Sequence, residues 1–201
     1  MTVVEERATV AEAGSEAARR AMIDSQLRVS GVNDLAILAA FLAVPREDFV
    51  PEARRPVAYA DRAVALDNGA VLSPALTYGQ MLTAAEPTAD DSVLVIGNPG
   101  GYLAALAGKL AGKVTLVAAT GDWASAGEHS LVLVDGAIEE LPAALAAVVA
   151  ADGRIVTGVV ERGVTRLALG RKVAGALALT VLAEADFAAL APFAAARKWS
   201  F

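Results

Sequence analysis

The stretch from Val93 to Ala107, VLVIGNPGGYLAALA, decides how the chain folds. The apolar run Ser92 to Ile96 has the length and composition of a strand that is buried on both faces. Gly97 to Gly101 then form a glycine-rich turn, and Tyr102 to Leu110 have the pattern of a helix. Such a turn is a ready site for a nucleotide-like ligand, because glycines let the backbone approach the ligand and the start of the helix leaves N–H groups free. Taken alone the motif is a weak signal, since tight turns also use glycine for purely structural reasons.

Further apolar runs of strand length follow this unit toward the C-terminus. They are Lys113 to Ala119, Ser130 to Val134, Arg154 to Val160, Val164 to Leu169 and Ala176 to Leu182. A helix from Leu141 to Ala150, closed by Gly153, separates the second and third of these runs. The last two runs are spaced like an antiparallel hairpin at a sheet edge. We therefore expect an α/β fold with a Rossmann-like sheet that is mostly parallel and has an antiparallel C-terminal edge.

Helices dominate the sequence before this sheet. Ser15 to Val29 have helical spacing with Ser15 as N-cap, and a second helix starts after Asn33 and stops at Pro45. The proline-rich segment from Pro45 to Gly69 predicts short irregular pieces. Ser73 and Pro74 then open a third helix that runs to about Ala85. We expect one domain over residues 1–201, with an N-terminal helical segment at 15–86 and a Rossmann-like core at 90–201.

Composition narrows the classes of function. The 201 residues include no Cys and one His, which argues against disulfides, thiolate chemistry and His-cluster metal sites, and we predict no metal. The formal net charge is −6 and the Lys and Arg residues are scattered, so the footprint of a nucleic-acid binder is missing. Although 56% of residues are hydrophobic, alanine inflates this figure and no run of about 18 strongly apolar residues exists. We expect a soluble, cytoplasmic protein with neither a nucleic-acid nor a membrane partner.

Four longer segments resemble one known family. MIDSQLRVSGVNDLAILAAFLAVPREDFVP (Met22 to Pro51), AYADRAVALDNG (Ala58 to Gly69), LSPALTYGQML (Leu72 to Leu82) and VLVIGNPGGYLAALA (Val93 to Ala107) occur in the order seen in protein-L-isoaspartate O-methyltransferases. VPREDFVP and AYAD are the most distinctive matches. The resemblance is good from Met22 to Gly112 and resumes more loosely from Ser130. It implies a seven-stranded sheet, S-adenosylmethionine as methyl donor, and methyl esterification of the isoaspartyl carboxylate in damaged proteins.

The same resemblance implies the site residues. Ser73, in the sequence GAVLS, matches the active-site serine of the family's GQTIS-type loop and is the catalytic candidate. An N-cap before Pro74 is the alternative role of Ser73. Methyl transfer to an ionised carboxylate needs positioning more than a base, so a lack of His or Cys is no objection. The predicted cofactor-binding residues are Gly97, Asn98, Gly100, Gly101 and Tyr102.

Four departures from the family pattern fall on the cofactor site. Val95 stands where the family motif has an acidic residue, and Pro99 stands in place of the middle glycine. Ala118 replaces a carboxylate at the end of the second strand that would hold ribose hydroxyls. Only about ten residues, Thr120 to His129, connect to the next strand, so we predict that the sheet lacks its third strand. Asp122 could replace a lost carboxylate, although a turn role suits Gly121-Asp122 better.

The remaining candidates have structural interpretations. His129, beside Glu128, is predicted to be solvated. Glu139 and Glu140 suit a helix N-terminus, where carboxylates oppose the helix dipole. The aromatic residues near the C-terminus are expected to close the core or a subunit contact; they are Phe187, Phe193, Trp199 and Phe201.

Two hypotheses on function remain open at this point. The first is a working isoaspartyl methyltransferase, an enzyme that binds S-adenosylmethionine and acts on damaged proteins or peptides. The second is a catalytically silent homologue that keeps the fold and serves as a binding or assembly protein. The departures at the cofactor site favour the second hypothesis for activity, because losing charged hydrogen bonds to a ligand weakens binding steeply. The family assignment holds under both.

Overall fold

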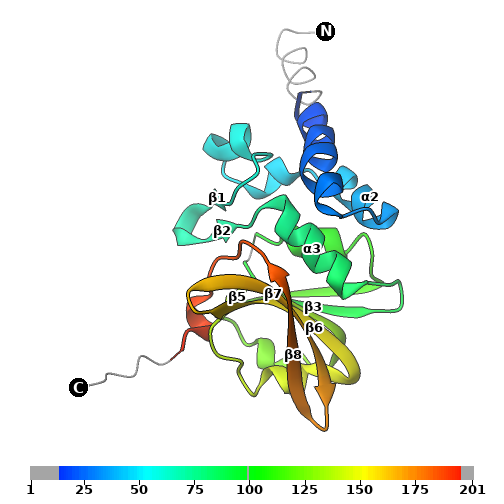
Figure 1. Cartoon of the computed structure of the whole chain (residues 1–201), viewed down its shortest axis with the longest axis vertical. Helices are drawn as coiled ribbons and strands as arrows, with labels where there is room; N and C mark the ends of the chain where they lie inside the picture. The colour runs from blue at the N-terminus through cyan, green and yellow to red at the C-terminus, as the bar shows by residue number, and fades with distance from the viewer. Residues whose placement is uncertain (1–13, 99, 196–201) are drawn as a thin grey trace, which may run out of the picture.

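A computed structural model describes residues 14–98 and 100–195 of the chain. Its main feature is a six-stranded sheet with the strand order β4-β3-β5-β6-β7-β8 (Figure 1). The strands are β3 (Ser92–Gly97), β4 (Lys113–Ala118), β5 (His129–Ile138), β6 (Val149–Glu161), β7 (Val164–Val173) and β8 (Ala176–Glu184). The first four run parallel, and β7 and β8 pair antiparallel as a hairpin. The predicted α/β fold with an antiparallel C-terminal edge is therefore confirmed.

Strand β3, next to the edge strand β4, is covered on both faces, as its continuous apolar run predicts. Val93 and Val95 belong to a core shared with the N-terminal helices, whereas Leu94 and Ile96 face a second core on the other side of the sheet. All four are at most 1% exposed. The alternation follows from the two-residue period of a strand. Val95 therefore faces the N-terminal helices, and Ile96 faces the opposite side of the sheet.

The helical layer lies over one face of the sheet (Figure 1). Residues 14–22 are α-helical and continue through a π-helical turn, Ile23–Leu27, to a left-handed glycine at Gly31 (φ 90°). Helix α2 is Leu35–Ala43, and α3 is Ala75–Ala85. The N-cap of α2 is Asp34 rather than the predicted Asn33, because the Asp34 carboxylate accepts hydrogen bonds from the backbone of Ala36 and Ile37 at 2.8 and 2.9 Å.

Short pieces fill the segment between α2 and α3, as its prolines predict. They are the 3₁₀ turns η3 (Arg46–Phe49), η4 (Glu52–Val57) and η5 (Asp67–Gly69) and the two-stranded ribbon of β1 (Val64–Ala65) and β2 (Val71–Leu72). In Figure 1 much of this segment, including β1 and β2, lies to the left of the first helix, above the sheet.

The predicted helix from Leu141 to Ala150 is wrong over most of its length. Only α5 (Leu145–Val148) is α-helical, and Val149 already begins β6. Val149 pairs with His129 of β5, and its carbonyl accepts a hydrogen bond from Lys172 at 2.8 Å. Alanine is a strong helix former, but helix propensity is a weak preference that tertiary contacts override, here the pairing of Val149 with β5.

Two polar predictions in this half are also wrong. Glu139 and Glu140 open no helix; the Glu139 carboxylate instead accepts a hydrogen bond from the Ala195 backbone at 2.8 Å. His129 is 5% exposed rather than solvated, and its Nδ1 lies 2.9 Å from the Ser92 hydroxyl. His129 is the first residue of β5 and is buried with that strand. The polar residues before it suggested an exposed loop, but the loop ends at Glu128.

One edge of the sheet is formed by β4. Residues 119–128 contain the 3₁₀ turn η6 (Trp123–Ser125) and, as described, no strand, so β4 is an edge.

Phe187 and Phe193 are buried in the two cores, as expected for the C-terminal aromatic residues, whereas Trp199 and Phe201 lie outside the described residues. No helix in residues 14–98 and 100–195 is long and apolar enough to cross a membrane.

Candidate functional site

A cavity of about 400 Å³ opens at the carboxyl ends of the parallel strands. Its wall consists of residues 69–71, 97–98, 118–120 and 188–192 together with Asp135. In open α/β sheets this edge is where ligands bind, because the loops that follow the strands diverge there. The cavity volume lies within the range of small-molecule sites. We take this cavity as the candidate site.

The glycine turn contributes Gly97 and Asn98 to the wall. A Cβ atom on Gly97 would lie 2.5 Å from Cβ of Asp135, so only glycine lets β5 approach β3 this closely. The Asn98 side-chain oxygen accepts a hydrogen bond from the Gly100 backbone at 3.0 Å. Its amide nitrogen is buried without a hydrogen-bond partner among the described residues. A buried donor beside a cavity is a ready contact for a ligand acceptor.

The other predicted residues of the turn lie differently. Gly101 takes the left-handed conformation (φ 71°) that starts helix α4 (Tyr102–Ala107), and Gly100 is exposed. Tyr102 is 1% exposed and does not reach the cavity wall. Its ring packs edge-on against those of Phe41, Phe49 and Tyr78. Pro99, the predicted weak point of the turn, lies outside the described residues.

Ser73 lies two residues beyond the loop that lines the cavity, and it is 2% exposed. Its backbone N–H donates to the Tyr78 hydroxyl at 3.1 Å, and its carbonyl accepts from Arg46 Nη2 at 2.6 Å. Pro74, not Ser73, is the N-cap of α3, and no side-chain cap bond is formed there. The alternative role of Ser73 as a helix cap is therefore wrong. Its backbone is firmly held next to the site, but Ser73 does not line the cavity.

Arg46 is the residue that holds this loop, and sequence reasoning missed it. The side chain is fully buried, and its Nε also donates to the Ala58 carbonyl at 2.7 Å. The guanidinium lies over the rings of Tyr102, at 5.2 Å, and Tyr78, at 5.9 Å. Buried arginines persist where they satisfy several acceptors in fixed positions. The available signal was its place inside VPREDFVP, the most distinctive segment of the chain.

Asp135 is the second residue that sequence reasoning missed. It is 8% exposed, and the Tyr78 hydroxyl donates to its Oδ2 at 3.4 Å. Burial raises the pKa of the Asp135 carboxyl to about 6, although the Tyr78 hydroxyl and the positive charge of Arg46 act in the opposite direction. The sequence signal was a charged residue directly after an apolar strand, at the same sheet edge as the glycine turn. Perturbed pKa values of this kind concentrate at functional sites.

The residues that depart from the family motif, and the proposed replacement Asp122, lie in different places relative to the cavity. Val95 is 1% exposed within the core, one strand from Leu133. Ala118 ends the edge strand β4 and lines the cavity. Asp122 stands before η6, forms no side-chain cap and does not line the cavity. Asp135 is thus the one carboxylate among the described residues of the cavity wall.

Comparison with known proteins identifies the family. The model of the family described as protein-L-isoaspartate(D-aspartate) O-methyltransferase matches residues 17–122, more than half of the chain. A protein-L-isoaspartate O-methyltransferase of Koribacter versatilis (strain Ellin345) is 33% identical, over 86% of this chain and 90% of its own length. The chain belongs to the protein-L-isoaspartate O-methyltransferase family. The match to the family model ends at the short connection that follows β4.

Solved structures of isoaspartate methyltransferases share the fold. A crystal structure of a Plasmodium falciparum protein, described as a putative protein-L-isoaspartate O-methyltransferase in complex with S-adenosyl-L-homocysteine, has a TM-score of 0.69 at 15% identity. It covers 89% of this chain and 98% of its own. A second protein-L-isoaspartate O-methyltransferase has a TM-score of 0.72 at 19% identity, over 86% of this chain and 65% of its own. At these identities the likeness concerns the fold alone.

Proposed function

We propose that the chain transfers a methyl group from S-adenosylmethionine to the isoaspartyl carboxylate of damaged proteins. One observation carries the proposal: the cavity brings the glycine turn and the loop that leads to Ser73 into a single wall. The sulfonium of S-adenosylmethionine supplies an activated methyl group. The substrate carboxylate is already ionised, so the protein needs to align the two groups rather than remove a proton. An active site without His or Cys is compatible with this chemistry.

The residues present fit such a methyl donor. Gly97 and Asn98 bring close backbone and a buried, unpaired amide donor to the cavity, and Ala118 and Ala119 form a wall of small side chains. We propose that Gly97, Asn98, Gly100 and Gly101 hold the donor, with Tyr102 supporting the turn from the core. Ser73 is proposed to act indirectly: Arg46 and Tyr78 hold its backbone, and this positions the preceding residues 69–71 that line the cavity and would orient the substrate carboxylate. Each of these roles requires position rather than acid–base strength.

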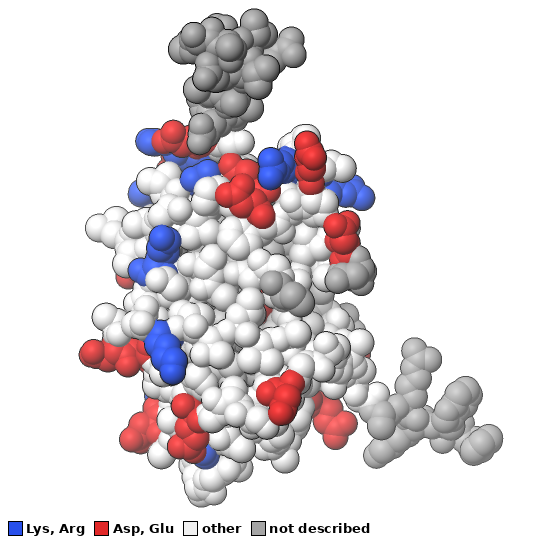
Figure 2. Space-filling view, turned by 180° about the vertical axis from the view of Figure 1, so that it is seen from behind, with Lys and Arg blue, Asp and Glu red and all other residues white. Residues whose placement is uncertain are grey.

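A catalytically silent binding protein is the second candidate, and the edge at β4 favours it. Val95 and Ala118 provide no carboxylate where the family motif has one, and the sheet ends at β4. We infer that the strand that the family places beyond β4 is absent and that the cavity is therefore open on that side. Lys and Arg side chains are scattered among Asp and Glu over the surface in Figure 2 rather than gathered in one basic patch. A binding role would therefore not depend on a basic surface on this face.

Titration calorimetry with S-adenosylmethionine and S-adenosylhomocysteine tests the proposal, together with transfer of labelled methyl groups to an isoaspartyl peptide. We expect micromolar binding and methylation of the isoaspartyl peptide but not of its aspartyl counterpart. No heat at millimolar ligand would overturn the enzyme function. Binding without transfer to any isoaspartyl peptide would support the silent homologue.

A further inference from the structure

We propose that Asp135 binds the positively charged amino group of the methyl donor, in place of the acidic residue that the family motif has at Val95. The inference rests on the proposed function and adds a residue that determines which ligand the cavity accepts. It depends on three features of Asp135: its place in the sheet, its unbalanced charge and its access to the cavity.

The register of the sheet puts Asp135 on the same face as Val95. Val95 pairs with Leu133 in the parallel ladder of β3 and β5, and both side chains belong to the core under the N-terminal helices. Asp135 follows Leu133 by two residues, and its contact with Tyr78 of α3, which belongs to this core, places its side chain on the same face. It lies one strand over, about 4.8 Å, and two residues further along, about 6.6 Å. The carboxylate of Asp135 thus lies just beyond the last β3–β5 pair, Ile96 with Val134, and beside Gly97 at the end of β3.

The charge of Asp135 has little compensation within the protein. In the part of the chain that the structure describes, no Lys, Arg or His nitrogen lies within 4.0 Å of its carboxylate. Tyr78 on α3 provides one long hydrogen bond. Arg46 on η3 attracts the carboxylate from further away; its Nε and Nη2 are engaged by the carbonyls of Ala58 and Ser73, and its Nη1 is buried without a hydrogen-bond partner among the described residues and forms no ion pair with Asp135. Charges this deeply buried are normally paired.

The remaining surroundings leave the cavity as the direction from which a cation can come. Gly97 closes the side toward β3, and the uncharged residues 188–190 run beside the end of β5. Asp135 itself is part of the cavity wall. An ammonium group supplies three N–H donors and a full charge, which matches a carboxylate with free acceptor positions. A sulfonium has the charge but no N–H donor, so the two cationic groups of the methyl donor can be told apart.

Calorimetric titration of the full chain with three ligands separates these possibilities. S-adenosylmethionine carries both cations, S-adenosylhomocysteine only the ammonium, and 5′-methylthioadenosine neither. We expect Asp135→Asn, which keeps the shape of the side chain, to weaken binding of the first two ligands at least tenfold and that of the third less than twofold. The control is Asp152→Asn, an exposed carboxylate beside the start of β5 at the opposite end of the sheet, which should leave all three unchanged.

Each other outcome has a definite meaning. Unchanged binding of all ligands to Asp135→Asn, or an equal loss for all three, overturns the inference while leaving the proposed function intact. A loss confined to S-adenosylmethionine overturns the amino-group assignment in favour of the sulfonium. If the unmodified chain binds none of the ligands, the proposed function fails and the inference fails with it.

A spectroscopic measurement tests the contact directly. Carbon-13 NMR of the aspartate carboxyls reports the pKa of Asp135 with and without S-adenosylhomocysteine. A neighbouring ammonium favours the ionised carboxylate, so we expect the ligand to lower this pKa. An unchanged or higher pKa in the bound state, where burial alone acts, would contradict the inference.

Discussion

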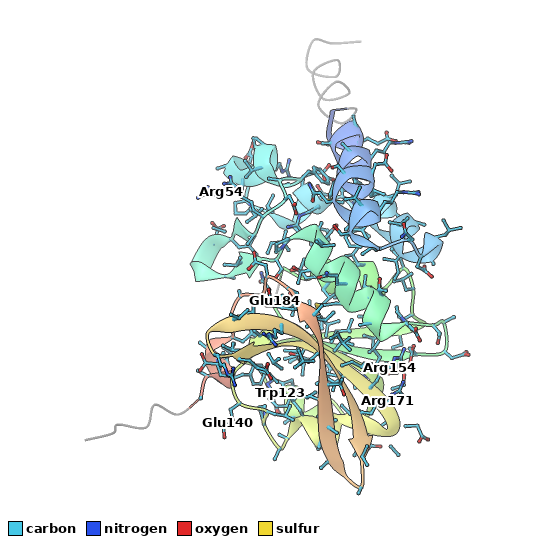
Figure 3. All side chains as sticks on the ribbon, in the orientation of Figure 1. Arg54, Trp123, Glu140, Arg154, Arg171 and Glu184 are labelled. Carbon is cyan, nitrogen blue, oxygen red and sulfur yellow. The ribbon has the colours of Figure 1, made fainter. Side chains whose placement is uncertain are left out.

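Arg154 binds Asp91 through two parallel hydrogen bonds: Nη2 lies 2.8 Å from Oδ2 and Nη1 lies 3.0 Å from Oδ1. This pair joins β6 to the residue before β3, at the end of the sheet opposite the cavity. Arg154 also donates to the carbonyls of Ala85 and Glu86, where α3 ends. Figure 3 shows Arg154 beside Arg171, its cross-strand neighbour on β7. One side chain therefore fastens α3 and two strands.

Arg154→Ala is expected to destabilise the protein by about 3 kcal/mol, because it leaves the Asp91 carboxylate buried without its partner. Thermal or urea unfolding at pH 7 measures the change. Arg171→Ala is the matched control, since Arg171 is exposed and faces the like charge of Arg154; we expect it to stay within about 0.5 kcal/mol of the parent. Equal effects of the two substitutions would show that the ion pair adds nothing.

Acid should remove the difference between Arg154→Ala and the parent chain. Burial alone would raise the pKa of Asp91, but hydrogen bonds from Arg154, Ser130 and Thr88 outweigh it and hold this pKa well below its usual range. A depressed carboxyl pKa stabilises the fold above the unfolded-state value of about 4, and this contribution is lost as the pH falls below it. The difference in unfolding free energy between the parent chain and Arg154→Ala should therefore be smaller at pH 3 than at pH 7. A constant difference would contradict this linkage.

Asp135→Asn should stabilise the fold at neutral pH, in contrast to its expected effect on ligand binding. The folded-state pKa of Asp135, about 6, lies above its ordinary value of 3.8, so the folded protein holds the proton longer than the unfolded chain. Stability therefore falls as the pH rises from about 4 to 6, by an amount on the order of 3 kcal/mol. We expect Asp135→Asn to exceed the parent in stability at pH 7 and to match it near pH 4. If Asp135→Asn is less stable than the parent chain at pH 7, the charge of Asp135 is compensated in the folded protein and this prediction is wrong.

The parallel core was predictable because its signals are local. Val93 to Ile96 is uninterrupted by polar residues, and Gly97 ends it where β5 comes close, so strand and turn followed from composition alone. The failed helix at Leu141 to Ala150 shows the limit of such signals. Its alanines favour helix, but Val149 pairs with His129 of β5, a contact that the local pattern does not contain.

The candidate site was only partly predictable for the same reason. Gly97 and Asn98 lie within a motif that can be recognised from the sequence, and both line the cavity. Arg46 and Asp135 acquire their roles through contacts with residues far along the chain, such as Ser73 and Tyr78. Nothing in the local pattern marks either residue as buried. Long-range packing therefore determines the electrostatics of the site.

Gly136→Ala should disturb the cavity wall formed by the segment after β8. A Cβ on Gly136 (φ 152°) would lie 2.5 Å from Cγ of Leu190 and 2.9 Å from the carbonyl of Ala188. Both residues bond to the backbone of Ala137, at 2.9 and 2.8 Å. We expect a loss of about 1–3 kcal/mol in stability and weaker binding of S-adenosylhomocysteine. Gly14→Ala is the control, because a Cβ at Gly14 has no neighbouring atom within 4 Å. If Gly136→Ala binds S-adenosylhomocysteine as well as the parent chain does, the segment after β8 is not part of the ligand site.

Ala118→Glu should strengthen ligand binding by supplying a carboxylate at the end of β4. Ala118 lines the cavity on an edge strand and is half-buried, so a longer side chain can extend without overpacking the core. A charged hydrogen bond to the ribose hydroxyls is worth about 1.5–3 kcal/mol, which corresponds to a gain of at least tenfold in affinity. Calorimetry should show the gain for S-adenosylhomocysteine and adenosine but not for adenine, which has no ribose. Ala118→Gln keeps the size without the charge and should gain less; an equal gain for Gln, or a gain for adenine, would contradict a carboxylate contact to the ribose.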